Sequence, residues 1–222
     1  MRHLLSLAIA CCLLSTTAFA AEEHQAHRRP ANIKHYLEQL DSEERDQHQK
    51  PRQVIEALNL KPGLTVADLG SGSGYFTRRF IEAVTETGKV YAVDVEPEML
   101  KYAEESVVHM HRSYTAEFIL ARPDSPKLPY ESIDLLFVCN TYHHLDERTK
   151  YFSDAKSSLK PDGRVAIIDF YHDERSGELG FPKRHLVPRE TVIAELTGAR
   201  YKLVREHHFL PKQYFLEFTP LQ

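Results

Sequence analysis

Residues 68–77 read DLGSGSGYFT. In this stretch three glycines occupy alternate positions, and they lie after an apolar run and before a predicted helix. Glycines at such a turn remove the side chains that would block close approach of a ligand, and the following helix offers the positive end of its dipole. The stretch therefore predicts a nucleotide-binding loop made of Gly70, Ser71, Gly72 and Gly74. The alternative interpretation is a tight turn that binds no ligand.

The spacing of the glycines separates classes of nucleotide. A dinucleotide fingerprint requires G-x-G-x-x-G, whereas this loop reads G-x-G-x-G with Tyr75 at the place of the third glycine. A phenol there would obstruct the close helix–strand packing that the dinucleotide motif uses. A P-loop is excluded because no G-K-[ST] follows. The spacing therefore disfavours a nicotinamide-dependent oxidoreductase.

The segments around the loop alternate between strands and helices. Buried strands are predicted at residues 64–69, 88–94, 115–121, 133–140 and 164–170. Apolar strands that alternate with helices imply a parallel sheet covered on both faces. Two further strands, at 201–210 and 213–218, are joined by a link too short for a parallel crossover. The prediction is an α/β fold with a Rossmann-like, doubly wound, seven-stranded sheet, mostly parallel with an antiparallel C-terminal strand.

Residues 1–20 have a composition of their own. They combine a basic start, an apolar stretch and a small-x-small end at Ala18–Ala20, which predicts a secretory signal peptide and a periplasmic or secreted protein. The apolar stretch is shorter than the roughly 18–20 residues that span a bilayer, which disfavours an uncleaved anchor. Lipid attachment at Cys11 or Cys12 is disfavoured as well. No later segment is predicted to span a membrane.

The charge argues against a nucleic-acid-binding protein, and the cysteine content argues against a protein held together by disulfides. The formal net charge of −4 gives no basic footprint for nucleic acid. Removal of residues 1–20 would leave Cys139 as the single cysteine, so no intrachain disulfide could form. Cys139 ends an apolar strand, and we expect a buried, inert thiol there.

Two acids lie beside the glycine loop. Asp68 precedes it, and Asp94 ends the strand at 88–94. A carboxylate at the end of the second strand can accept hydrogen bonds from both ribose hydroxyls of a bound nucleoside. The alternative for Asp94 is to cap the helix that Pro97 opens.

Four stretches occur in a recognisable order: VADLGSGSGYFT, YAVDVEPEML, IDLLFVCNTYHHL and LKPDGRVAIIDF. In this order they resemble the class I S-adenosylmethionine-dependent methyltransferases, and most of all the small-molecule branch that includes quinone-biosynthesis methyltransferases. The resemblance covers about residues 50–218. It implies S-adenosyl-L-methionine as cofactor and a small-molecule methyl acceptor. The implied organisation is an N-terminal tail and helical segment at 21–50 and the methyltransferase domain at 51–222.

The resemblance also implies roles around the cofactor. The glycine loop would pass under its methionine part, with Asp68 near the amino group. Asp94 would hold the ribose, Val95 would pack on the adenine, and Asp124 is a candidate for the adenine amino group. Asn140 would face the transferred methyl group. The residues placed at the cofactor are Asp68, Gly70, Ser71, Gly72, Gly74, Tyr75, Asp94, Val95, Asp124 and Asn140.

Candidate catalytic histidines follow the fourth and fifth predicted strands, where ligands bind in open α/β sheets. His143 or His144 could be a general base, and His172, near Asp169, is a third candidate. Alternatively, one of the paired histidines packs under the next helix and the other bonds to backbone. A metal site made of these four residues is disfavoured, since they lack a dedicated ligand spacing. The polar segment 171–187 is expected to be a lid or acceptor-binding loop.

Other functions remain to be weighed. The sequence NTYH after the fourth strand differs from the N-P-P-Y-like motif of amino-group DNA methyltransferases, and a single mature cysteine disfavours arsenite methylation. S-adenosylmethionine is made in the cytoplasm, so an exported enzyme lacks an obvious supply. The alternative is therefore a non-catalytic S-adenosylmethionine or nucleoside-binding protein that has kept the methyltransferase fold.

Overall fold

The computed structural model describes residues 32–179 and 182–221. The chain divides into two compact units, Met1–Tyr36 and Leu37–Gln222. In the first unit, the described residues form the first turn of α2 (Ile33–Leu40), where the backbone N–H of His35 donates to Asn32 Oδ1 at 3.1 Å. The predicted signal peptide at residues 1–20 lies outside the described residues.

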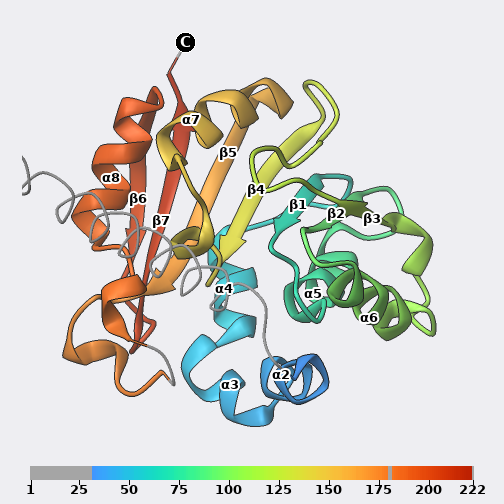
Figure 1. Ribbon diagram of the computed structural model, residues 1–222. Helices are drawn as coiled ribbons and strands as arrows, with labels where there is room; N and C mark the ends of the chain where they lie inside the picture. The colour runs from blue at the N-terminus through green and yellow to red at the C-terminus, as the bar shows by residue number, and fades with distance from the viewer. Residues whose placement is uncertain (1–31, 180–181, 222) are drawn as a thin grey trace, which may run out of the picture. The chain divides into compact units, whose positions relative to one another are not determined.

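The second unit is built on a seven-stranded sheet with the order β3-β2-β1-β4-β5-β7-β6 (Figure 1). Strands β1 to β5 pair in parallel, and β7 runs antiparallel to both β5 and β6. This confirms the predicted fold class. The strands are β1 (Thr65–Leu69), β2 (Lys89–Asp94), β3 (Ala116–Leu120), β4 (Ile133–Cys139), β5 (Leu159–Phe170), β6 (Tyr201–His207) and β7 (Gln213–Pro220).

The helices begin where local chemistry favours it. Ser42 separates α2 from α3, because its side chain accepts a hydrogen bond from the backbone N–H of Arg45. Pro51 and Pro97 occupy the first positions of α4 and α6, where a missing N–H costs nothing. The remaining helices are α3 (Glu43–Gln49), α4 (Pro51–Leu58), α5 (Tyr75–Val84), α6 (Pro97–Val107), α7 (Arg148–Ala155) and α8 (Arg189–Gly198). Among the described residues, no helix is long and apolar enough to cross a membrane.

Both faces of the sheet are buried. Leu135 and Phe137 of β4 belong to one apolar cluster, which also contains residues of α4 and α5. Leu136 and Val138 point to the other cluster, which contains residues of α7 and α8. This alternation gives β4 its continuous apolar sequence, as expected of a strand covered on both sides.

Strand direction brings the functional candidates to one edge of the sheet. The carboxyl ends of the parallel strands meet there, and open α/β sheets bind ligands at that edge. Because β7 is antiparallel to β5, it begins at the same edge, and Gln213 pairs in register with Phe170. β5 itself begins at Leu159, earlier than the predicted residue 164, because Leu159 already pairs with Ile133 of β4 before a register shift, and the ladder resumes at Arg164.

Candidate functional site

The glycine loop bends over the end of β2. The backbone N–H groups of Gly70 and Ser71 both donate to the Val93 carbonyl, at 2.7 and 3.0 Å. Gly70 has a φ of +74°, and a Cβ there would lie 2.1 Å from the Thr141 hydroxyl oxygen. Only glycine satisfies this combination of left-handed backbone and close approach. The loop from β1 is therefore packed directly against the segment that follows β4.

Asp94 joins the loop to the start of α6. Its carboxylate accepts from the backbone N–H of Gly72 at 2.9 Å and from that of Glu96 at 3.0 Å. Burial raises the pKa of Asp94, against these backbone donors, which lower it. A carboxylate has about four acceptor positions, so both oxygens keep capacity for further donors. Asp94 can therefore contact the start of α6 and still accept hydrogen bonds from a ribose, so the two interpretations of this residue are compatible.

Asp68 is buried beneath the loop, at the end of β1. The Thr77 hydroxyl donates to its carboxylate at 2.6 Å. Burial raises the pKa of Asp68 to about 6, and the hydrogen bond from Thr77 opposes that rise. Asp68 therefore carries a negative charge that the protein compensates only in part, which suits a cationic group of a ligand.

Residues 37–50, which we name the cap segment, are tied to the glycine loop by polar contacts. Asp41 accepts from the Ser73 hydroxyl and from Arg78, both at 2.7 Å. The Tyr75 hydroxyl donates to Asp46, and the Arg45 guanidinium lies 3.8 Å from the centre of the Tyr75 ring. These contacts hold the cap segment against the loop, whereas the sequence indicated only a helical segment within residues 21–50.

The residues around the loop fit a nucleoside ligand. The Ser71 side chain is buried, and its hydroxyl has no hydrogen-bond partner. Val95, directly after Asp94, is 45% exposed although it is apolar. An unsatisfied hydroxyl and an exposed apolar side chain, next to a carboxylate with spare acceptor positions, match the mixed polar and apolar surface of an adenosine.

Three carboxamides meet at the ends of β4 and β7. Asn140, with a left-handed φ of 55°, donates to Gln49 Oε1 at 3.3 Å. Gln213 donates to Asn140 Oδ1 and, at 3.4 Å, to Gln49 Oε1. Gln49 and Gln213 are both completely buried. We name this group the amide cluster; it links the cap segment to two strands.

A buried histidine and a buried aspartate face each other at the ends of β4 and β5. His143 Nδ1 lies 2.9 Å from both carboxylate oxygens of Asp169. The side chains are 2% and 0% exposed. The backbone N–H of His143 also donates to Asp169, at 3.2 Å. The pair therefore has a fixed geometry, in which Asp169 is the acceptor and Nδ1 the donor.

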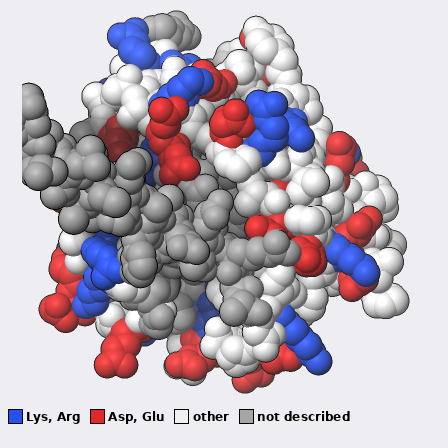
Figure 2. Space-filling view, in the orientation of Figure 1, with Lys and Arg blue, Asp and Glu red and all other residues white. Residues whose placement is uncertain are grey.

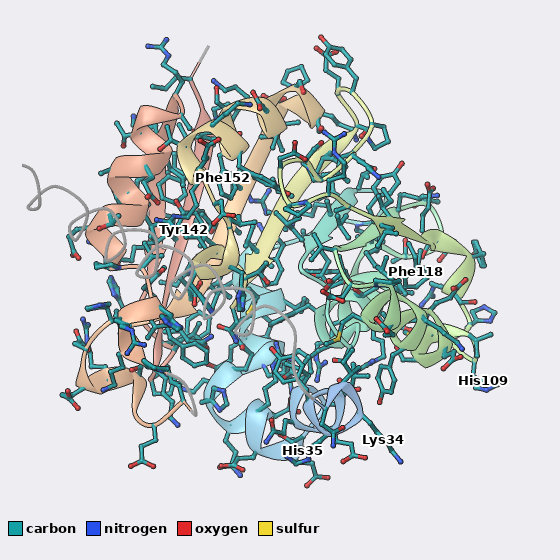
Figure 3. All side chains as sticks on the ribbon, viewed as in Figure 1. Lys34, His35, His109, Phe118, Tyr142 and Phe152 are labelled. Carbon is teal, nitrogen blue, oxygen red and sulfur yellow. The ribbon has the colours of Figure 1, made fainter. Side chains whose placement is uncertain are left out.

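The turn that carries His143 is anchored from beneath. Tyr142 is completely buried, stacks on Phe152 with ring centres 5.5 Å apart, and donates its hydroxyl to Glu195 at 2.7 Å (Figure 3 labels both rings). His144 packs beside His143, with ring centres 4.2 Å apart, and is half-buried. These contacts fix the position of the turn that carries His143 at the carboxyl edge of the sheet.

The other candidates lie elsewhere. His172, expected near Asp169, is exposed in the turn after β5, and His143 occupies the position beside Asp169. Asp124 is an exposed residue of the loop after β3 and pairs with Arg122 at 3.0 Å. Cys139 is buried, and burial raises the pKa of its thiol to about 12. The roles of the histidines and of Asp124 stay predictions.

The charged and metal-ligating side chains of the described residues indicate no second functional site. Figure 2 shows Lys and Arg interspersed with Asp and Glu over the described part of one face. Within residues 32–179 and 182–221, no group of three or more His, Cys, Asp and Glu side chains is placed to hold a metal ion.

The fold and the carboxyl edge of the sheet are those of an α/β protein with a glycine loop after β1 and an acid at the end of β2. Residues 67–167 match a protein family described as "Methyltransferase domain". Residues 67–167 thus belong to the class I S-adenosylmethionine-dependent methyltransferases, a family whose methyl donor is S-adenosylmethionine.

Relatives of known name agree with this family. The chain is similar to the ubiquinone/menaquinone biosynthesis C-methyltransferase UbiE of Escherichia fergusonii, with 29% identity over 54% of this chain and 47% of the relative. The protein of that name from Pseudoalteromonas translucida is 25% identical over 70% of this chain and 63% of its own. The chain thus spans about half to just under two thirds of the curated relatives that it matches.

A solved structure matches over a longer range. The crystal structure of a SAM-dependent methyltransferase from Aquifex aeolicus superposes with a TM-score of 0.78 and 28% identity. The match covers 85% of this chain and 98% of that one. The likeness therefore extends beyond residues 67–167, which match the methyltransferase family.

Proposed function

We propose that the protein transfers the methyl group of S-adenosylmethionine to a small-molecule acceptor that binds over the ends of β4 and β5. One observation carries this proposal: a single short segment after β4 contacts three different parts of the site. Thr141 packs against Gly70 of the glycine loop, Asn140 joins the amide cluster, and His143 pairs with Asp169. The names of the UbiE relatives, which act in quinone biosynthesis, support a small-molecule acceptor.

The residues that would hold the cofactor are those around the glycine loop. When bound, S-adenosylmethionine supplies a methyl group on a positively charged sulfur. In the proposal, Asp94 accepts from the ribose hydroxyls, Val95 packs on the adenine, and Ser71 offers its unpaired hydroxyl. Asp68 compensates positive charge from beneath. Each role follows from the burial and bonding of that side chain.

His143 is the proposed proton acceptor. Its Nδ1–H donates to Asp169, which leaves Nε2 as the basic nitrogen of the neutral ring. The Asp169 carboxylate stabilises the imidazolium that forms when Nε2 takes a proton, as the acid of a catalytic triad does for its histidine. A base is required where the acceptor group is protonated at the working pH.

The test uses the purified full chain. Calorimetry with S-adenosylmethionine, S-adenosylhomocysteine and NAD identifies the ligand, and transfer of a labelled methyl group to a panel of small molecules identifies the activity. We expect His143→Gln and Asp169→Asn to lower kcat about 10²–10⁴-fold while cofactor affinity is retained. The control is His109→Gln, at an exposed histidine in the turn after α6 that Figure 3 labels.

Other results would select other functions. Binding of NAD alone would overturn the proposal. Tight binding of S-adenosylmethionine without transfer to any member of the panel would favour the non-catalytic binding protein. Equal kcat values for wild type and His143→Gln would remove the histidine from the mechanism while leaving the activity in place.

We also propose that the protein acts in the periplasm or outside the cell. The support is the sequence of residues 1–20, with its basic start, apolar stretch and Ala18–Ala20 end. Mass spectrometry of the protein isolated from its native host should show a mature N-terminus at Ala21. An intact Met1 on that protein would contradict the proposal.

A further inference from the structure

The amide cluster contains two buried polar atoms that make no hydrogen bond. Gln49 Nε2 has no acceptor, and Gln213 Oε1 has no donor. Both residues are 0% exposed, so bulk water does not serve them. An unsatisfied buried group of this kind costs about 1–3 kcal/mol. Two of them in touching carboxamides are therefore a strong indication of a missing partner.

The bonding inside the cluster determines what that partner must offer. Turning one carboxamide alone would place nitrogen against nitrogen or oxygen against oxygen. Turning all three together reverses each bond, but it again leaves one donor on one glutamine and one acceptor on the other. In either arrangement the missing partner must accept one hydrogen bond and donate one. A water molecule does both, and so does the hydroxyl group of an organic ligand.

Gln213 is the member of the cluster that lies farthest from the cofactor loop in the sheet order. Gln213 begins β7, which lies beyond β4 and β5 from β1 in the sheet order. It pairs in register with Phe170, the neighbour of Asp169. The cluster and the His143–Asp169 pair therefore lie on two sides of the same strand end, where we place the acceptor.

The cluster is also held firmly. Gln49 is the last residue of α3, and the left-handed Lys50 that follows it donates from Nζ to the Phe209 carbonyl at 2.8 Å. Asn140 is fixed by its backbone N–H, which donates to the Ile168 carbonyl at 2.9 Å. The unpaired atoms thus have defined positions rather than a choice of partners.

We propose that Gln49 and Gln213 form an acceptor-binding subsite that holds a hydroxyl group of the methyl acceptor, which makes the substrate class a hydroxyl-bearing small molecule. This inference rests on the proposed methyltransferase function. Gln49 Nε2 donates a hydrogen bond to the hydroxyl oxygen. Gln213 Oε1 accepts a hydrogen bond from the same hydroxyl group. The neutral amides select an uncharged hydroxyl, since a carboxylate could not donate to the remaining acceptor.

The experiment measures binding of a matched panel to the full chain saturated with S-adenosylhomocysteine. The probes are mono- and dihydroxylated benzenes and naphthalenes, and the same compounds with every hydroxyl converted to a methyl ether. We expect hydroxylated probes to bind and ethers to bind at least tenfold more weakly. Gln213→Met and Gln49→Met should each weaken hydroxyl binding about tenfold, the value of one hydrogen bond. Gln53→Met, on an exposed residue of α4, is the matched control.

S-adenosylhomocysteine affinity is the second readout, and it separates this inference from the function on which it rests. We expect S-adenosylhomocysteine affinity to change less than twofold in both variants. Gln49 lies outside the sheet, so Gln49→Met tests the subsite if Gln213→Met fails to fold. A tenfold loss of S-adenosylhomocysteine affinity would assign the two amides to the cofactor and overturn the inference. Panel binding that is equal for hydroxyls and ethers, or absent, would overturn it as well. If wild type bound no S-adenosylhomocysteine at all, the proposed function itself would fail.

Discussion

Asp41 Oδ1 lies 2.7 Å from both the Ser73 hydroxyl in the glycine loop and a guanidinium nitrogen of Arg78 in α5. The same carboxylate accepts from the Tyr102 hydroxyl of α6 at 3.3 Å. One acid between α2 and α3 therefore connects the cap segment to the loop and to both helices beneath it. The cap segment is held by directional polar bonds, which a single substitution can remove.

Replacement of Asp41 by alanine is expected to loosen the cap segment. The Asp41–Arg78 pair is about three-quarters buried, with side chains 22% and 24% exposed, so its loss should lower the free energy of unfolding by about 2 kcal/mol. Urea unfolding measures this change, and hydrogen exchange should become faster within residues 37–50. Asp162→Ala, at an exposed site, is the control. Unchanged exchange in Asp41→Ala would mean that apolar packing alone holds the segment.

Gly70→Ala is expected to disrupt the cofactor loop. The new Cβ would lie 2.1 Å from Thr141 at a φ of +74°, so the loop or the turn after β4 must move. We expect a loss of more than about 2 kcal/mol in the free energy of unfolding, together with loss of S-adenosylhomocysteine binding. Gly177→Ala is a close control, because Gly177 has a φ of +70° but its nearest neighbour atom lies at 3.7 Å. That variant should cost about 1–3 kcal/mol, because Gly177, with a ψ of −152°, has a backbone conformation that essentially only glycine adopts, and it should leave S-adenosylhomocysteine binding unchanged. Retained S-adenosylhomocysteine binding in Gly70→Ala would show that the Thr141 contact is unimportant for the cofactor loop.

Asp94→Asn tests the ribose assignment. The amide nitrogen cannot accept a hydrogen bond, so either the loop N–H of Gly72 or a ribose hydroxyl loses its acceptor. We expect the affinity for S-adenosylhomocysteine to fall at least about tenfold by calorimetry. Asp162→Asn should leave that affinity unchanged. If Asp94→Asn lowered stability but not affinity, Asp94 would serve only the loop and the start of α6.

The buried carboxyl of Asp68 predicts a pH dependence of stability. Its pKa is raised from 3.8 to about 6, so between these values the folded protein holds a proton that the unfolded chain has released. The free energy of unfolding should therefore fall as pH rises from about 4 to 6, and the full penalty, on the order of 2–3 kcal/mol, remains at neutral pH.

The measurement compares wild type with Asp68→Asn, which cannot titrate. The difference in unfolding free energy between the two proteins, from urea denaturation at several pH values, should change across pH 4–6 in favour of the variant. The difference isolates Asp68 from other groups that titrate in the same range. A constant difference across that range would show that Asp68 keeps its ordinary pKa.

The fold could be predicted from the sequence because its signals are local. The apolar runs at 64–69 and 133–140, the glycine loop between 70 and 74, and the short link before Gln213 each indicate an element or a connection within a few residues. Ser42 is a local signal of the same kind, because a serine at this position caps the start of α3. Boundaries were less well defined, as at β5, because Leu159 pairs with Ile133 of β4 ahead of the 160–163 turn and so extends the strand.

The pairings within the site could not be predicted, because they join residues far apart in the chain. Asp169 could be assigned to His172 from proximity in sequence, yet the alternation of β5 turns it toward His143 of the neighbouring strand end. Gln49 and Gln213 are separated by 164 positions, and neither carries a motif. Only the antiparallel placement of β7 brings Gln213 to the edge where ligands bind.

Tyr75 has a consequence beyond its position in the glycine loop. Its hydroxyl bonds to Asp46, its ring lies under Arg45, and Arg79 packs on it with the guanidinium 4.0 Å from the ring centre. A glycine at position 75, which a dinucleotide motif would require, would leave three charged residues without their shared contact. Redesign of this site for nicotinamide cofactors would therefore also weaken the contact between the cap segment and α5, so the choice of ligand and the anchoring of the cap segment depend on the same residue.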